Sequence, residues 1–325
     1  RDNYIYTKGL FSNAKKIRFK LIKDIQNPEY NEIFLTPRLT FNAYDKVLLG
    51  LNFKNQGIFD QKFDYSLTPY YSTGTGKLTG FGAINYSILP PNSFFRRWNF
   101  GVSGSYFHYD NDLAYKRFGA GTSFDFQKNP RSAIGRSLYF SYNYYERELT
   151  PLMIRNNQYS KYNLWNIGYS YSDNSLIHEK YIGTNLQWME DFQKISAEAF
   201  YRWEFAKDKK ISFRLFAGYF LRNDTKNALF NYGISRVSNY SFSYGLLGQS
   251  ATSGILSQQF ILAEGGFKSF FNTSVNQFIT SVNVDSHLWK WFNLYADAGI
   301  YKNRTRQAEF IWDSGVKVKV VPDFL

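Results

Sequence analysis

The chain has 325 residues, 20% of them aromatic, with no cysteine and a formal net charge of +13. No apolar run approaches the roughly 18 residues of a transmembrane helix, and the missing cysteines leave no basis for disulfides or thiolate chemistry. The Lys and Arg residues are scattered without a long basic run, so lumen and rim charges explain the positive balance, and no nucleic-acid partner is expected.

The first residues show no clear period. We expect 1–14 to be a tether and 15–325 to form one domain. Residues 15–25 alternate through Ile17, Phe19 and Leu21 and are either a first strand or a basic segment beneath the fold. The chain opens at Arg1 without a leader, so we expect a mature product or a fragment.

From Glu32 onward, apolar and polar residues alternate with period two, which predicts strands with one apolar and one polar face. Turn residues such as Gly, Pro, Asn and Asp separate the segments. The expected strands are a hairpin over 33–53, and then 60–71, 77–88, 95–107, 114–127, 137–148, 161–172, 180–190, 194–206, 209–222, 258–271, 275–286, 291–302 and 309–321.

The hairpin over 194–222 shows the pattern most clearly. Ile211, Phe213 and Leu215 alternate with Ser212 and Arg214. Strands of about a dozen residues suit a tilted bilayer crossing better than a soluble sheet. The sequence therefore predicts an all-β fold, an antiparallel transmembrane β-barrel of about 14–16 strands in the outer membrane of a Gram-negative bacterium. A soluble β-sandwich is the weaker alternative, because its strands are shorter.

Two connections are long, 149–160 and 223–257, and long barrel loops normally lie outside the cell. The second is rich in Tyr, Ser, Asn and Gly, which suits surface contact or a folded plug. An ordinary surface loop is the first interpretation. The candidate contact residues are Tyr232, Tyr240, Tyr244 and Arg236.

The polar strand faces carry both signs of charge, which favours pairing inside the barrel over an open pore. The candidate lumen charges are Glu198, Arg202, Arg214, Asp297 and Asp313. No catalytic, cofactor-binding or metal-binding residue is predicted. His178-Glu179 begins like a zinc helix, but the second His of H-E-x-x-H is absent.

Several stretches resemble one family, the C-terminal outer-membrane barrel region of bacteroidete-type zinc metallopeptidases of the membrane alanyl aminopeptidase (gluzincin) family. They are IKDIQNPEYNEIFLTPRLTFNAYD (Ile22 to Asp45), FDYSLTPYYS (Phe63 to Ser72), SGILSQQFILAEGGFKS (Ser253 to Ser269), LWKWFNLYADAGIYKNR (Leu288 to Arg304) and FIWDSGVKVKVVPDF (Phe310 to Phe324). The resemblance implies a zinc-dependent peptidase domain elsewhere in the parent polypeptide, with zinc as its cofactor and none in this chain. It also implies closing strands after Leu325, in keeping with the proline near that end.

We therefore expect a membrane anchor that orients a metallopeptidase-like module and is not itself an enzyme. The expected partners are outer-membrane lipid and lipopolysaccharide, the peptidase domain, and other outer-membrane proteins. The alternative function is a stand-alone pore, or an accessory barrel subunit of a larger complex.

Overall fold

The computed structural model describes residues 15–21, 24–27, 29–58, 61–91, 93–126, 129, 131–242, 262–289 and 291–318. Its strands are β1 Ile17–Leu21, β2 Asn31–Asn42, β3 Lys46–Lys54, β4 Phe63–Ser72, β5 Leu78–Ile88, β6 Arg97–Asp110, β7 Leu113–Asp125, β8 Ile134–Arg147, β9 Lys161–Asn174, β10 His178–Met189, β11 Phe192–Ala206, β12 Lys209–Asn223, β13 Tyr232–Gly233, β14 Ser274–Val275, β15 Phe278–Trp289, β16 Phe292–Lys302 and β17 Glu309–Val318. Two short helices, α1 Pro151–Arg155 and the 3-10 helix η1 Ala228–Phe230, lie in the long connections.

A single sheet of 15 strands contains every strand except β13 and β14, in chain order. Neighbours from β2 onward pair antiparallel, some through tight turns, as where Met189 pairs with Phe192, and others through long connections, as between β8 and β9 and between β12 and β15. Strand β1 instead pairs parallel with β2. Without β1, 14 strands alternate in direction, which is an even number, as single-chain bacterial barrels have.

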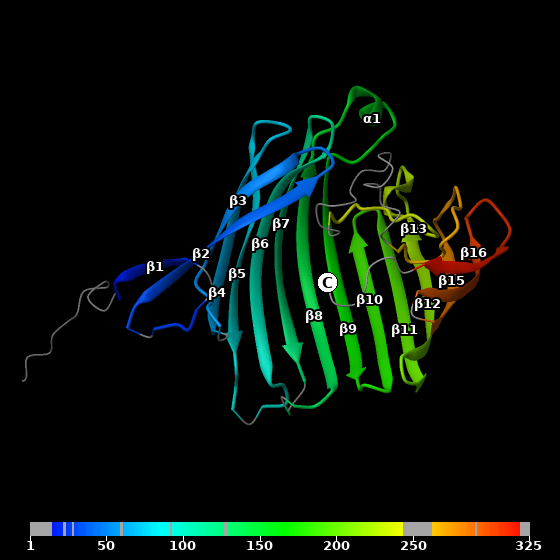
Figure 1. Ribbon diagram of the computed structural model, residues 1–325. Helices are drawn as coiled ribbons and strands as arrows, with labels where there is room; N and C mark the ends of the chain where they lie inside the picture. The colour runs from blue at the N-terminus through cyan, green and yellow to red at the C-terminus, as the bar shows by residue number, and fades with distance from the viewer. Residues whose placement is uncertain are drawn as a thin grey trace, which may run out of the picture.

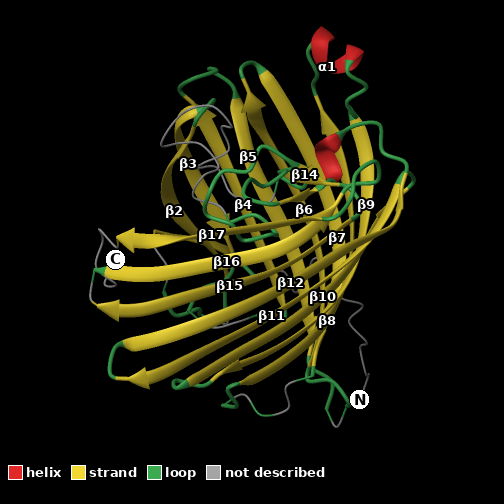
Figure 2. Ribbon diagram, turned by 90° about the vertical axis from the view of Figure 1, so that its right-hand side faces the viewer, coloured by secondary structure: helices red, strands yellow, loops and turns green. Residues whose placement is uncertain are grey.

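The sheet curls into a trough with its long strands side by side (Figure 1). Strands β4 to β12 form the back wall, and β2–β3 and β15–β17 curve forward at the two sides (Figure 2). Among the described residues, β17 pairs only with β16, so the sheet has a free edge there. The curvature is that of a barrel wall, because a twisted antiparallel sheet curls as strands are added.

The two faces of the wall differ as period two requires. Leu215 is 52% exposed on the convex side, whereas its neighbour Phe216 is 6% exposed on the concave side. Apolar side chains cover the convex face along most strands, including Val102 on β6 and Leu294 on β16. An apolar outer face over an inner face rich in polar groups is the arrangement of a transmembrane barrel of the bacterial outer membrane.

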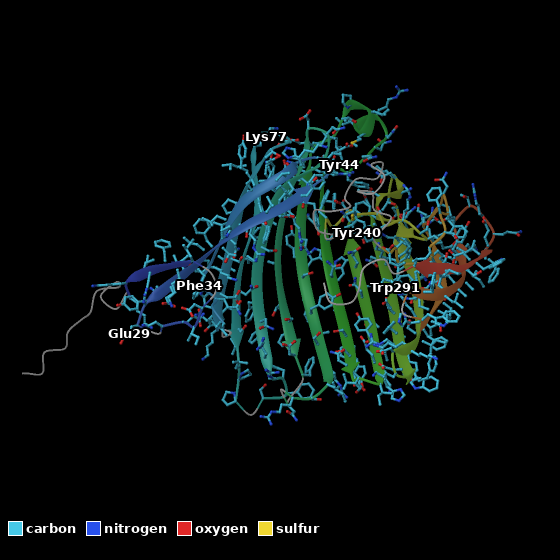
Figure 3. The ribbon with its side chains drawn as sticks, viewed as in Figure 1. Glu29, Phe34, Tyr44, Lys77, Tyr240 and Trp291 are labelled. Carbon is cyan, nitrogen blue, oxygen red and sulfur yellow. The ribbon has the colours of Figure 1, made fainter. Side chains whose placement is uncertain are left out.

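Aromatic residues gather at both ends of the convex face, where a bilayer meets water. At one end, Trp98 stacks on Phe124 with ring centroids 5.4 Å apart. At the other end, Trp165 stacks on Trp188 at 6.1 Å. Figure 3 shows Trp291 at the outer edge of the forward-curving side. Two aromatic girdles mark the membrane–water interfaces. No helix in the described part of the chain is long and apolar enough to span a membrane.

The all-β prediction is confirmed, and most expected strands lie within a few residues of the observed ones. The strand expected over 258–271 is wrong for 262–271, which forms turns around Gly266 at a φ of +76°. The strand expected over 275–286 begins three residues later, at Phe278. The 15–25 segment is a strand in part, and the tether expected over 1–14 lies outside the described residues.

Candidate functional site

The connection between β12 and β15 turns back into the trough. We call its described residues, 224–242 and 262–277, the plug. A two-stranded sheet, β13 with β14, joins its two halves. Figure 2 shows these loops and η1 enclosed by the curling sheet, and Figure 3 shows Tyr240 over the middle of the wall. The plug and the inner wall facing it are therefore the candidate functional site.

Aromatic rings form the contact between the plug and the back wall. Phe230 is fully buried, and its ring lies about 5 Å from those of Tyr162, Phe192 and Tyr240. Phe242 stacks almost parallel on Tyr115 of β7, with 3.9 Å between ring centroids. Large aromatic surfaces removed from water on both sides make this a stable packing core.

Hydrogen bonds fix the plug to the wall at positions buried from water. The Tyr240 hydroxyl donates to Gln187 Oε1 at 2.6 Å, and the Tyr162 hydroxyl donates to the Tyr240 carbonyl at 2.5 Å. The Tyr232 hydroxyl donates to the Ile195 carbonyl at 2.8 Å. The Tyr232 ring lies so close to Gly218 that a Cβ there would come within 2.8 Å of it. Because Gly218 has no side chain, the wall leaves room for the Tyr232 ring.

One lysine of the wall is enclosed by the plug. Lys194 on β11 is 5% exposed, and its Nζ donates to the Phe230 carbonyl at 2.9 Å. The same Nζ lies 4.6 Å from the Tyr240 ring centroid and 4.8 Å from that of Tyr232. Phe192 adds a third ring at 5.5 Å. Cation–π attraction and one hydrogen bond offset the desolvation of a buried ammonium, and the plug supplies most of both.

A polar cluster fastens the second half of the plug to the forward side of the sheet. Lys268 Nζ lies 2.7 Å from Asp297 Oδ1 on β16. The backbone N–H groups of Lys268 and Ser269 both donate to Asp313 Oδ2 on β17, at 3.1 and 2.5 Å. Asn283 Nδ2 donates to Asp297 Oδ1 at 3.0 Å and to the Gly265 carbonyl at 3.2 Å. Two carboxylates of the wall thus hold one turn of the plug.

The other predicted lumen charges are paired with the opposite sign across neighbouring strands. Arg214 lies 2.7 Å from Glu198, and Arg202 lies 2.5 Å from Glu179. All five predicted lumen charges point to the concave side. Asp297 and Asp313 meet at Lys268, while Glu198, Arg202 and Arg214 pair along the wall.

Two of the four residues predicted to make surface contacts are buried inside the trough instead of exposed on a surface loop. Tyr232 and Tyr240 are 2% and 8% exposed and face the wall. Arg236 is exposed and its guanidinium lies 4.7 Å from the Phe270 ring centroid. Tyr244 lies outside the described residues. For Tyr232 and Tyr240 the surface interpretation is wrong, because their rings complete an aromatic core that the wall cannot fill alone.

Below the plug, the concave face holds a polar hollow of about 320 Å³. Amides, hydroxyls and glycines of β5 to β8 line it, among them Asn85, Asn99 and Ser103. Arg117 reaches across, and its Nε and Nη2 both donate to Asn143 Oδ1 at 3.2 and 2.9 Å. The hollow suits water or a neutral polar solute.

The described residues hold no group of three or more His, Cys, Asp or Glu side chains placed to bind a metal. His178 Nδ1 pairs with the Tyr201 hydroxyl at 2.8 Å at a strand end.

Sequence reasoning did not identify the residues that hold the plug, among them Lys194, Phe230, Lys268 and Asn283. One signal was available, since Phe230, Tyr232 and Ile234 alternate with Asn231 and Gly233 inside the expected loop. Apolar residues at every second position of a loop indicate a buried face.

No family model matches the sequence, and no curated protein matches it. The chain is similar in shape to BamA from Haemophilus ducreyi, in a crystal structure lacking POTRA domains 1–3, with 8% identity and a TM-score of 0.47. That match covers 87% of this chain and 62% of the crystallised BamA chain. CdiB from Acinetobacter baumannii is similar over 93% of this chain and 61% of that protein, with 12% identity and a TM-score of 0.41.

This chain spans about three fifths of the length of both structures. The likeness is one of fold and assigns no residue a role. The chain's own long antiparallel strands and the apolar outer face of its sheet are those of an outer-membrane barrel.

Proposed function

We propose that this chain is an outer-membrane barrel closed by its own plug, which anchors and orients a larger protein at the membrane. The observation that supports this most directly is the plug core, in which Phe230, Tyr240 and Lys194 join the long connection to the back wall. A barrel filled by its own chain is rigid and has no open channel. These properties suit a membrane anchor better than a pore.

The pairing of the lumen charges supports the same function. Arg214 with Glu198, and Lys268 with Asp297, neutralise one another inside the trough. An ion-selective pore instead presents rings of one sign to the passing ion. Charges that are satisfied internally contribute to rigidity and leave little field for selectivity.

Closure of the barrel is part of the proposal. The outer edge of β17 and the part of β2 beyond its contact with β1 would expose unpaired backbone groups to hydrocarbon, at a cost of several kcal/mol for each group. We infer that the two edges pair in the membrane, either with each other or through further strands of the same protein.

The anchored module belongs to the proposal as well. The stretches that resemble the barrel region of gluzincin-type metallopeptidases favour a peptidase-like domain in the parent polypeptide, with zinc bound there. Outer-membrane lipid, lipopolysaccharide and other outer-membrane proteins are the remaining proposed partners. The proposed peptidase activity of the whole protein is based on that resemblance alone.

A pore or accessory subunit is the second candidate, favoured by the polar hollow beneath the plug. Single-channel recording in planar bilayers separates the two functions. We expect wild-type protein to insert without steady conductance, and a Phe230→Ala, Tyr240→Ala double variant to show conducting steps because its plug is loosened. Tyr169→Ala, on the convex face of the same wall, is the matched control and should stay closed.

Steady ohmic conductance of the wild type would contradict the closed-anchor function and favour the pore. Heat modifiability in gel electrophoresis shows whether each variant is folded before it is recorded. A folded double variant that stays closed would mean that the plug core does not close the lumen.

A further inference from the structure

The convex face of the wall has a second hollow, of about 540 Å³, at the rim where the long connections leave the sheet. Residues of β8 to β12 line it. One row of directly paired residues crosses five strands at this height, formed by Tyr142, Trp165, Trp188, Gln193 and Arg222. The row begins as an aromatic platform and ends in polar groups.

The aromatic part of the row is accessible, with its two tryptophan rings nearly parallel and its Tyr142 ring tilted by 54° from that of Trp165. Trp165 is 47% exposed and stacks on Trp188, with an angle of 9° between the ring planes. The Tyr142 ring lies 4.7 Å from Trp165, and the Tyr142 hydroxyl donates to Asn163 Oδ1 at 2.9 Å. A girdle needs only aromatic side chains at the interface. Here Trp165 and Trp188 also line a hollow together with polar side chains.

Hydrogen-bonding groups surround the platform. Glu190 and Gln193 are exposed, and in the described part of the chain no hydrogen bond or ion pair is seen for either side chain. The Nε1–H groups of Trp165 and Trp188 are likewise without a partner among the described residues. A few polar groups converging on an apolar floor are the usual composition of a small-molecule site.

The charged residues that line the hollow are balanced, two basic and two acidic, and both basic ones are paired. Lys161 pairs with Glu146 at 3.6 Å, and Arg222 pairs with Asp224 at 3.3 Å. Glu190 and Asp191 are the two carboxylates that line the hollow beside Lys161 and Arg222. A phosphate would therefore find no unpaired cation among the described lining residues, whereas a neutral or amino-substituted ring with many hydroxyls would find both donors and acceptors.

We propose that this hollow, the rim site, binds a sugar ring. One face of such a ring is made of C–H groups and packs on Trp165 and Trp188, while its hydroxyl edge bonds to Glu190, Gln193 and Asn163. Two sources can supply the ring, the head group of a glycolipid in the outer leaflet or a soluble glycan. The rim site is separate from the plug and does not depend on the anchor function.

The test uses the full chain in phosphatidylethanolamine nanodiscs and follows acrylamide quenching of tryptophan fluorescence. Two probes are used, lipooligosaccharide incorporated in the disc and its lipid-free core oligosaccharide in solution. We expect protection from quenching to saturate with at least one probe. A Glu190→Gln, Gln193→Ala double variant should bind that probe at least tenfold more weakly, while Trp203→Ala, in the opposite girdle, should bind it like wild type.

Protection by both probes would identify a sugar site open to soluble glycans, and protection by lipooligosaccharide alone would identify a glycolipid head-group site. Protection by neither probe would overturn the proposal. So would an equal response to phosphatidylglycerol discs without sugar, or equal affinity of the double variant and the wild type.

Discussion

Tyr159 shows how a single residue joins the outer connections to the plug. It lies between α1 and β9, and its hydroxyl donates to Asp191 Oδ2 at 2.6 Å. The Lys226 backbone N–H donates to the same hydroxyl at 3.3 Å, and the ring packs edge-on against Phe230 at 5.2 Å. Burial and then the hydrogen bond to Asp191 raise the pKa of Tyr159 to about 12.

This raised pKa predicts a loss of stability in alkali. The folded state keeps the Tyr159 proton at a pH where the unfolded chain releases it, so the contribution of Tyr159 is complete below pH 10.0 and is lost as the pH rises through about 12. We expect Tyr159→Phe to cost about 1–2 kcal/mol at pH 8, and this difference from wild type to shrink between pH 10 and 12. Urea unfolding in detergent at several pH values measures it.

Tyr169→Phe, on the lipid-facing side of β9, is the control for removing a tyrosine hydroxyl that does not hold the plug. A difference between wild type and Tyr159→Phe that stays constant from pH 8 to 12 would contradict the assigned role of the hydroxyl.

The sequence predicts which face of the sheet a single residue occupies, but not whether that residue is buried. That Arg214 and Asp297 face inward follows from period two alone, since each lies out of phase with the apolar stripe of its strand. Lys194 obeys the same period, yet its burial depends on Phe230 and Tyr240, which come from more than 30 residues further along the chain. Alternation fixes the face of a residue but carries no information on what covers that face.

At the scale of elements, the hairpin β11–β12 represents the whole wall. Leu215 pairs across the sheet with Ala199 and Val282, and all three point to the convex side near mid-strand. A cation at this depth would lie in hydrocarbon.

We expect Leu215→Arg to lower the free energy of unfolding in lipid vesicles by about 2–4 kcal/mol. Leu215→Ile keeps the apolar contact and should change it by less than about 1.5 kcal/mol. Urea titrations of both variants in the same vesicles measure the two effects. Equal stability of Leu215→Arg and wild type would mean that this face is not in contact with lipid.

The segment 258–271 explains why one expected strand is missing. Ala263, Gly265 and Phe267 alternate with Leu262, Glu264 and Gly266, which reads as a short strand. In the fold, Ala263 is buried beside Gly233 of the plug and Phe267 beside Gly299 of the wall, while Gly266 takes a positive φ that ends any extended run. Buried turns and half-buried strands share the same local pattern, and only the long-range contact of Lys268 with Asp297 distinguishes them.

At the scale of the whole molecule, the wall and the plug depend on each other. The inner faces of β7 to β12 present aromatic rings such as Tyr115 and Phe220, which would be exposed in an empty barrel. The plug covers them and in return has its own Phe230 and Ile234 buried. Aromatic rings on the inner face would meet water in an unfilled barrel, so the plug belongs to the folded state and is not a surface loop that moves aside freely.

A lumen filled by the plug favours the proposed anchor function over transport. If the chain anchors a module, the polypeptide in the native outer membrane should be much larger than the 38.1 kDa of these 325 residues. An antibody against the α1 connection, 149–160, should detect a species of more than twice that mass on blots of the outer-membrane fraction. Zinc chelation should leave the barrel folded, because the described wall and plug contain no metal site. A single species near 38.1 kDa would contradict the anchor function and leave an accessory subunit, since a self-sufficient plugged barrel would have no attached module to orient.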